Sequence, residues 1–224
     1  MQVIIAGTGK LATELLQSME VAPSAKLASW ANKSSEASKS IVVHAGSGRE
    51  LEAIASYCES TQATLIELAT GSKIEFMPVA FPVVLCPNTN ILMLKFMAML
   101  EQCGKMFNRY EIDIIESHQA SKTSVPGTAV NIAHSFGMSG SDIQSVRDTS
   151  IQRTQLEIPE ADIERHAFHQ VMIHEGKCSV KLETRVYGEA PYSQGVAQIV
   201  AAAYGNKLES RIYSIMEFVK NGWL

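Results

Sequence analysis

The chain has 224 residues and a mass of 24.4 kDa, which is enough for one large domain or two smaller ones. Hydrophobic residues make up 46% and charged residues 19%, as in ordinary globular proteins, so wholesale disorder is excluded. The net charge is −4, the pI is near 5.9, and no basic cluster is present. Nucleic acid is therefore not an expected partner.

The beginning of the chain, MQVIIAGTGK, lacks the basic leader of a signal peptide. The run 76–94 carries no charge, but its three prolines and two asparagines would break a membrane-spanning helix. We therefore expect a cytoplasmic protein that has no membrane partner. Four widely spaced cysteines form no C-x-x-C pair, so we expect reduced, buried thiols, with neither a zinc site nor a disulfide framework. These are Cys58, Cys86, Cys103 and Cys178.

The first 90 residues alternate between short apolar runs and stretches with helical spacing. The apolar runs are typical of buried parallel strands, and strand–helix alternation at this spacing predicts a doubly wound parallel sheet of the α/β class. The expected strands are 3–6, 27–30, 41–43, 64–68 and 82–86, and the expected helices are 11–19 and 50–58.

The pattern changes after Cys86 and indicates a mixed second half with antiparallel strands. Residues of alternating character on either side of Glu175-Gly176 predict a β-hairpin, and Pro126 is well placed to start a helix. In the second arm of the hairpin, alternate residues from Cys178 to Val186 share one face. The expected helices are 90–107, 126–138, 191–204 and 208–220, the expected strands are 110–115, 166–174 and 177–187, and a polar loop is expected over 116–125.

A glycine turn follows the first expected strand. Residues 7–12 read G-x-G-x-x-A where the first strand meets the first helix. Gly7 and Gly9 permit a tight turn whose N–H groups can reach a pyrophosphate, and Ala12 allows close helix–strand packing. This position predicts a dinucleotide site; the alternative is a purely structural tight turn.

The end of the second strand bears on which dinucleotide is bound. An NAD enzyme usually carries Asp or Glu there, but residues 31–35 contain no acid. Lys33 is flanked by polar side chains and suits a 2′-phosphate, which favours NADPH over NADH without excluding NADH. The alternative is that Lys33 is a solvated loop lysine.

The loop 116–129 combines a histidine, a lysine and hydroxyl groups ahead of a helix N-terminus. Gly127 and Thr128 offer backbone N–H groups and a hydroxyl to an anion, most simply a carboxylate. His118 is a candidate proton donor, and Lys122 can supply positive charge or donate a proton. The alternative is that these residues only cap the helix and meet solvent.

These residues resemble a known family, the dihydrodipicolinate reductases, also called 4-hydroxy-tetrahydrodipicolinate reductases. The family motif E-x-H-H-x-x-K-x-D-A-P-S-G-T-A is similar to residues 116–129, which are one residue shorter between proline and glycine. Residues 86–90 look like its A-x-N-F-S segment, 69–71 like the end of its G-T-T-G turn, and 9–12 like its G-R-M-G turn. The resemblance runs over nearly the whole chain.

The resemblance implies a Rossmann-type domain, a second mixed α/β domain and a homotetramer. The implied cofactor domain covers 1–89 and 205–224, and the implied substrate and assembly domain covers 90–204. The implied chemistry is hydride transfer from NAD(P)H to a cyclic dicarboxylate imine of lysine (diaminopimelate) biosynthesis.

The resemblance also assigns roles to individual residues. His118 matches the proton donor, Lys122 its cationic partner, and Gly127 and Thr128 the groups that hold a substrate carboxylate. Gln119 stands at the second, substrate-binding histidine; it can donate a hydrogen bond but cannot carry charge. The residues expected at the cofactor are Gly7, Gly9, Lys10, Leu11, Lys33, Ala45, Thr70 and Pro87.

The chain departs from the family pattern at several positions. Ser124-Val125-Pro126 replaces D-A-P-S, His44-Ala45-Gly46 replaces D-F-T, and Thr184 and Glu189 replace a histidine and an arginine. Loss of positive charge near a dianion pocket disfavours that substrate. Two alternatives therefore stay open: a related amino-acid or imine dehydrogenase, and an NADP-binding homologue without catalysis.

The remaining histidines do not have the spacing of a metal site, and none is expected. His166 and His169 are expected to be structural, with His169 similar to a family H-T-V strand start. His44 ends a strand at the expected cofactor crevice and either contacts ligand there or has no functional role. Cys86 lies in an apolar run, so an inert thiol is expected.

Overall fold

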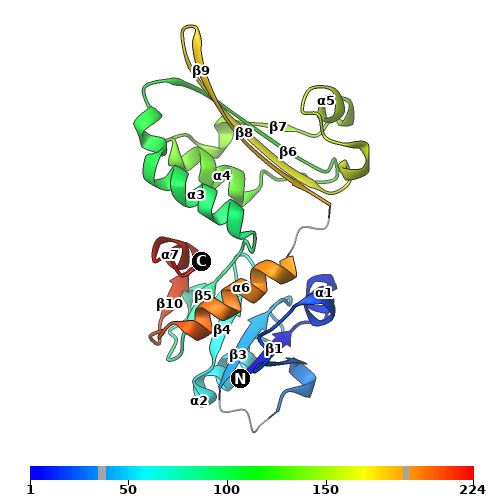
Figure 1. Cartoon of the computed structure of the whole chain (residues 1–224), viewed down its shortest axis with the longest axis vertical. Helices are drawn as coiled ribbons and strands as arrows, with labels where there is room; N and C mark the ends of the chain where they lie inside the picture. The colour runs from blue at the N-terminus through cyan, green and yellow to red at the C-terminus, as the bar shows by residue number, and fades with distance from the viewer. Residues whose placement is uncertain (35–38, 189–191) are drawn as a thin grey trace. The chain divides into compact units, whose positions relative to one another are not determined.

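The computed structural model describes residues 1–34, 39–188 and 192–224. The chain forms two compact units (Figure 1). Unit 1 contains Met1–Leu94 and Pro191–Leu224, and unit 2 contains Lys95–Ala190.

Unit 1 is built on a parallel six-stranded sheet with the strand order β10-β5-β4-β3-β1-β2. The interior strands are buried on both faces, which is why their sequences are almost continuously apolar. The predicted parallel α/β sheet is thus confirmed. The strands are β1 (Gln2–Ala6), β2 (Lys26–Ser29), β3 (Ser40–His44), β4 (Thr64–Glu67), β5 (Val83–Leu85) and β10 (Ile212–Ser214).

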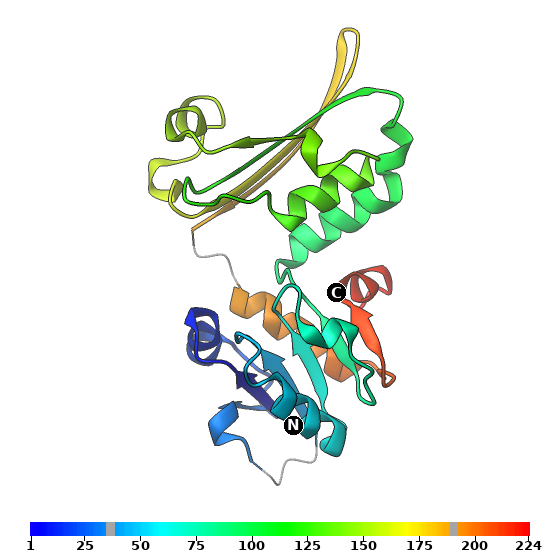
Figure 2. The same ribbon diagram turned by 180° about the vertical axis from the view of Figure 1, so that it is seen from behind.

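Helices cover both faces of this sheet. Alternate residues of β3 face opposite sides: Val43 packs with α1, α6 and α7, whereas Val42 packs with α2 and the short helix η2. Figure 1 shows α6 crossing one face, and Figure 2 shows α2 on the other. The helices are α1 (Lys10–Ser18), α2 (Leu51–Thr61), α6 (Tyr192–Gly205) and α7 (Ile215–Lys220), and the 3₁₀ helices are η1 (Trp30–Asn32) and η2 (Lys73–Phe76).

Helix α6 lies in unit 1, whereas the family resemblance implied that residues up to 204 belong to the second domain. Val196 and Ile199 are fully buried against Val3 on the sheet. A Cβ at Gly195 would lie 1.9 Å from the carbonyl oxygen of Thr89, so the helix approaches the backbone there more closely than any other residue would allow. Its apolar face therefore completes the core of unit 1.

The segment 208–220 was expected to be one helix, and this was wrong. It forms β10 and then α7. Tyr213 is buried where β10 pairs with β5. Ser214 and Glu217 form a capping box that starts the helix only after the strand.

Unit 2 is built on a mixed four-stranded sheet with the order β7-β6-β8-β9. Strands β6 and β7 are parallel, and the other pairs are antiparallel. The predicted hairpin is confirmed: β8 and β9 pair along their whole length, and Gly176 has φ +58° at the turn. The strands are β6 (Glu111–His118), β7 (Ile143–Val146), β8 (His166–Glu175) and β9 (Cys178–Tyr187).

One face of this sheet is covered by α3 and α4, which bury Leu100, Ile132 and Phe136 against Ile114 and Val171. On the other face, Phe168 of β8 and Val146 of β7 pack with Leu156, Ile158 and Ile163 in a smaller cluster. The remaining helices are α3 (Ile91–Cys103), α4 (Gly127–Ser135), α5 (Thr149–Thr154) and the 3₁₀ helices η3 (Gly104–Phe107), η4 (Gly140–Asp142) and η5 (Glu160–Asp162).

Several boundaries in unit 2 differ from expectation. Strand β6 continues to His118, so the polar loop begins at Gln119 and not at Glu116. The α-helix predicted to reach 107 ends at Cys103, because Gly104 lies against the carbonyl of Ser135 and the chain tightens there into η3. The short elements β7 and α5 were not anticipated, since neither shows a clear period.

Two further expectations concern the membrane and the thiols. Among the described residues, no helix combines the length and the apolar character that crossing a bilayer requires. All four cysteines are free; Cys58 and Cys86 are buried, but Cys103 and Cys178 are exposed, so the expectation of four buried thiols was wrong for two of them.

Candidate active site

The glycine turn lies at the carboxyl end of β1. Gly7 has φ +136°, and a Cβ there would lie 2.5 Å from the carbonyl oxygen of Ala45, so this position requires glycine. Gly9 is the N-cap of α1, with no side chain to satisfy the free N–H groups and no acidic residue in the first turn, where Lys10 and Leu11 stand. Such a helix N-terminus is suited to an anion.

Other residues expected at the cofactor lie along the same edge. Ala45 follows β3, Thr70 follows β4, and Pro87 follows β5. A cavity of about 500 Å³ opens between the loops after β3 and β4; Thr70 lines it, as do the cationic Arg49 and Lys73. The structure therefore brings these residues to the edge where ligands of parallel α/β sheets bind.

Lys33 lies at the carboxyl end of β2, just after η1. Its ammonium donates a hydrogen bond to the carbonyl of Trp30 (3.2 Å) and lies 4.0 Å from the centroid of the Trp30 ring. A cation–π contact of this kind holds the side chain close to its own turn. The ammonium is therefore anchored at the strand end where a 2′-phosphate is expected.

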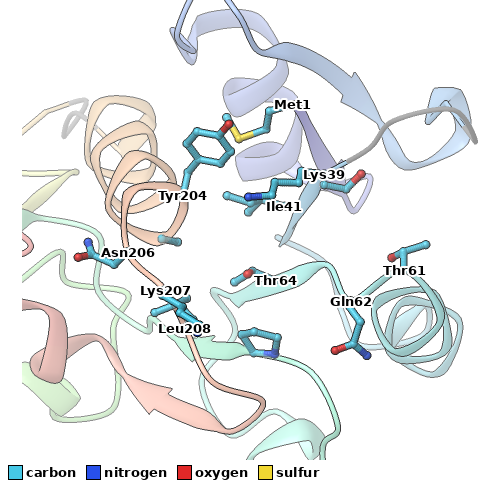
Figure 3. A pocket seen from close by; sticks show the side chains of 13 residues that line it. Met1, Lys39, Ile41, Thr61, Gln62, Thr64, Tyr204, Asn206, Lys207 and Leu208 are labelled. Atoms are coloured by element: carbon cyan, nitrogen blue, oxygen red, sulfur yellow. The ribbon is translucent and has the colours of Figure 1, made fainter.

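A second cavity, of about 360 Å³, lies at the other end of the sheet, beside the amino ends of its strands (Figure 3). Its walls come from the amino ends of β3 and β4, with Lys39, Ile41 and Thr64, and from the end of α6, with Tyr204. Ligands of such sheets bind outside the carboxyl ends of the strands, so this cavity lies away from the place where a dinucleotide is expected.

His44 is fully buried and turned toward α2. Its Nδ1 lies 2.8 and 2.9 Å from the two carboxylate oxygens of Glu67. Glu67 also accepts hydrogen bonds from the Ala69 N–H and the Ser72 hydroxyl. His44 thus joins the ends of β3 and β4, and it also lines the cavity of about 500 Å³, with no hydrogen-bond partner for its Nε2 among the described residues.

In unit 2, Glu116 and His118 point to the same face of β6, because residues two apart on a strand share a face. The Nδ1 of His118 lies 2.8 Å from Oε2 of Glu116, whose carboxylate is fully buried. A carboxylate can only accept, so Nδ1 carries a proton and Nε2 is left for another partner. The imidazole is 13% exposed, so that nitrogen is near the surface of the unit.

The charge of Glu116 is strongly stabilised. Burial alone would raise the pKa of this carboxyl, but hydrogen bonds from His118, Arg147 and Ser145 outweigh burial and hold the pKa at about 2. The carboxylate therefore stays ionised at neutral pH. It is a fixed negative charge beside the imidazole.

Arg147, which the sequence analysis did not single out, follows β7. Its Nη2 donates to Oε1 of Glu116 (2.6 Å), and its Nε donates to the backbone carbonyl of Lys122 (2.8 Å). Glu116 was expected in a polar loop, where a carboxylate meets solvent and needs no buried cation. The sequence therefore carried no signal that pointed to Arg147.

A second set of hydrogen bonds secures the end of β6 from the other face. The buried amide of Gln152 donates to the carbonyl of His118 (2.8 Å) and to the hydroxyl of Ser117 (3.0 Å). Nδ1 of His166 donates to the carbonyl of Ile163, so its Nε2 accepts from the Ser117 hydroxyl (2.9 Å). His166 is thus a satisfied structural histidine, as expected.

His169 lies opposite Glu116 in the β6–β8 register, and its ring meets that of His118 edge-on at 5.6 Å. Its Nδ1 is 3.1 Å from the hydroxyl of Thr184. Burial lowers the pKa of His169 to about 4, and the charge of His118 contributes in the same direction against the opposing effect of Glu116. His169 is therefore neutral at physiological pH.

The loop after β6 leads directly into α4. Lys122 donates its backbone N–H to the carbonyl of Gln119 (3.0 Å), which closes a turn. Pro126 is the N-cap of α4, and Gly127 and Thr128 form the first turn, which contains no acidic residue. The loop is tied to the Glu116 network through the Lys122 carbonyl, which accepts from Arg147, and it ends at a helix N-terminus that can receive an anion.

The structure also bears on metal binding and on Glu189. Among the described residues, no three or more His, Cys, Asp or Glu side chains gather where they could hold a metal ion. Glu189, one of the departures from the family pattern, lies outside the described residues.

Comparison with known proteins gives a family and a fold. The family model described as "Dihydrodipicolinate reductase, C-terminus" matches residues 93–219, more than half of the chain. The chain is 31% identical over 134 residues to 4-hydroxy-tetrahydrodipicolinate reductase 1, chloroplastic, of Arabidopsis thaliana, which covers 55% of this chain and 39% of that protein. It is 28% identical over 135 residues to a probable reductase of the same name from Oryza sativa subsp. japonica, with 55% and 39% covered. The match thus spans about two fifths of these relatives.

Solved structures support the same fold. A dipicolinate-bound dihydrodipicolinate reductase from Paenisporosarcina sp. TG-14 has a TM-score of 0.65 at 14% identity, covering 95% of this chain and 97% of that one. A DAP dehydrogenase of C. glutamicum in complex with DAP has a TM-score of 0.51 at 7% identity, covering 97% and 93%. At these identities the likeness concerns the fold alone.

Proposed function

This chain belongs to the dihydrodipicolinate reductase family, and from that premise we propose that it is an NAD(P)H-dependent reductase of a cyclic dicarboxylate imine, with a role in lysine (diaminopimelate) biosynthesis. The observation that carries the proposal is the pairing of His118 with a buried, ionised Glu116 at the end of β6, followed in the chain by the Lys122 loop and the N-terminus of α4. The imidazole of His118 is 13% exposed, so it is not sealed within unit 2.

The residues of unit 1 fit a dinucleotide. Gly7 has no side chain that would collide with the carbonyl of Ala45. The uncapped N-terminus of α1 at Gly9 offers N–H groups to a pyrophosphate. We propose NADPH as the preferred form and NADH as a weaker substitute, because Lys33 offers a cation and no acidic residue stands among residues 31–35. When bound, the reduced nicotinamide supplies the hydride.

On the substrate side, His118 is proposed as the proton donor. Its Nδ1–H is held by Glu116, so the proton to be delivered resides on Nε2. Glu116 keeps its own charge throughout, since its pKa of about 2 lies far below neutral pH.

The proposed anion site holds the carboxylate groups of the substrate. Lys122 provides a full positive charge, and Gly127 and Thr128 provide N–H groups and a hydroxyl at the start of α4. Gln119 adds a neutral donor where the family has a histidine. The chain has fewer cations here than the family pattern, so the exact dicarboxylate is identified by assay.

We also propose a homotetramer, by analogy with the family. Light scattering of the purified protein tests the tetramer.

The test of the function compares two site variants with two matched surface variants. His118→Asn and Lys122→Gln are expected to lower kcat for dihydrodipicolinate by about 10²-fold or more, with unchanged dinucleotide affinity. His174→Asn and Lys177→Gln, near the tip of the hairpin, are expected to leave kcat unaltered. A panel of cyclic imines and amino acids should show no better substrate than dihydrodipicolinate.

Three results would count against the proposal. If both site variants turn over like the wild type, these residues are not in the chemistry. If another imine or amino acid is turned over better, the chain is a related dehydrogenase. If NADPH binds but nothing in the panel is reduced, it is a binding protein.

A further inference from the structure

Arg147 is the residue through which three neighbouring parts of unit 2 are joined. Strands β6 and β7 are parallel, with Ser117 opposite Val146, so the residue after β7 is brought beside the end of β6. From there the guanidinium donates to Glu116 on β6 (2.6 Å), to the carbonyl of Lys122 (2.8 Å) and to the carbonyl of Val146 (3.0 Å). Its side chain is 21% exposed, so most of it is withdrawn from solvent.

These bonds constrain the imidazole of His118 indirectly. The carboxylate of Glu116 is planar, and one oxygen binds Arg147 while the other binds Nδ1 of His118. Fixing the first oxygen therefore fixes the direction from which the second receives the imidazole. The same guanidinium holds the backbone from which the Lys122 side chain extends.

We infer that Arg147 is a positioning residue: its guanidinium fixes in one arrangement the carboxylate that orients His118 and the backbone that carries Lys122. The inference rests on the proposed function, because it assigns a role within that site. Arg147 does not need to touch the substrate for this role.

The planar fork of arginine is what this role requires. A guanidinium presents donors in several fixed directions, so it can serve a carboxylate and two carbonyls together. A lysine in its place keeps the positive charge beside Glu116 but is a single, flexible point of donation. If only the positive charge beside Glu116 matters, lysine at position 147 keeps the activity. If the fixed directions of the guanidinium donors matter, lysine does not keep it.

The experiment uses the full chain with Arg147→Lys and Arg147→Gln. Arg153→Lys and Arg153→Gln serve as controls, because Arg153 on α5 pairs with an exposed glutamate and is 47% exposed. Each protein is checked for cooperative unfolding and then measured for kcat, KM and dinucleotide affinity. In the absence of ligand, nitrogen NMR of isotope-labelled histidine reports which ring nitrogen of His118 carries the proton.

Both Arg147 variants are expected to lower kcat by about 10- to 100-fold, with KM changed less than about threefold, since a small misplacement of a catalytic group has effects of this size. In both variants the Glu116 carboxylate is no longer fixed by the guanidinium and can turn away from Nδ1 of His118. The His118 signal should therefore change from one fixed Nδ1–H form to a mixture of the two tautomers. The Arg153 variants should match the wild type in every measurement. The lysine variant remains informative if the glutamine variant does not fold.

Two results would overturn the inference: wild-type kcat in Arg147→Lys, or an unchanged His118 tautomer in the Arg147 variants that fold. Failure of the proposed function is a separate outcome. A wild-type protein that reduces no imine refutes that function, while the tautomer measurement still decides whether Arg147 positions His118.

Discussion

Replacing Glu116 by glutamine removes the charge at the centre of the unit 2 network while keeping the shape of the side chain. The wild-type carboxylate is fully buried and is hydrogen-bonded to both His118 and Arg147. In the variant, the buried part of Arg147 loses its counter-charge. Breaking one partner of a buried pair in this way is usually strongly destabilising.

The size of the effect follows from the pKa of Glu116. Its fall from 4.5 to about 2 corresponds to about 3 kcal/mol, since each tenfold change in proton affinity is worth about 1.4 kcal/mol. The pKa in the folded state is the lower one, so this stabilisation is fully present above pH 4.5. It is lost as the pH falls toward 2.

Amide hydrogen exchange of β6 and β8 measures the free energy of opening within unit 2. Glu116→Gln is expected to lower it by about 3 kcal/mol at pH 7, with the difference shrinking toward pH 2. The control is Glu160→Gln, which removes an exposed partner of Arg153 and should cost less than about 1 kcal/mol. Equal protection in the two variants at pH 7 would refute the reasoning.

Three other predictions concern separate parts of the chain. Gly7→Ala should destabilise the protein by about 1–3 kcal/mol and weaken NADPH binding. Gly9→Ala has open space around its Cβ position and should leave thermal stability nearly unchanged. Equal effects of the two substitutions would contradict the steric clash expected between a Cβ at position 7 and the carbonyl of Ala45. Burial raises the pKa of the Cys58 thiol to about 12, so disulfide-reagent kinetics should show exposed Cys103 reacting far faster, and similar rates would be the contrary result. His169 has a folded-state pKa of about 4, so it contributes stability above pH 6.5 that disappears by pH 4. The free energy of unfolding of His169→Asn, measured in urea, should therefore depend less on pH between 6.5 and 4 than that of the wild type. An unchanged dependence on pH would argue against a buried neutral ring.

Much of the fold was determined by local sequence patterns. Continuous apolar runs such as 3–6 and 41–43 marked strands buried on both faces, and strict alternation around Gly176 marked the hairpin. Gly7 was recognisable from the G-x-G-x-x-A spacing directly after the first strand, and its backbone conformation and contacts in the structure require glycine. These features reflect the burial of side chains and the backbone dihedral angles, which a short stretch of sequence is enough to indicate.

Local patterns failed where two elements of similar composition meet. Residues 208–220 are apolar enough for one helix, but pairing with β5 draws Tyr213 into a strand, and Ser214 restarts the chain as α7. Helix α6 has the same apolar character in either domain. Its packing on Val3 and its close approach to Thr89 at Gly195 place it in unit 1.

For the site, the sequence by itself determined that His118 and Lys122 stand ahead of a helix N-terminus, because capping and spacing are local. It did not determine what orients them. Arg147 reaches Glu116 from 31 residues away, and His169 faces the same carboxylate from an antiparallel strand. Both contacts depend on the register of strands distant in sequence, which is set by the packing of the whole sheet and leaves no periodic trace in any one segment.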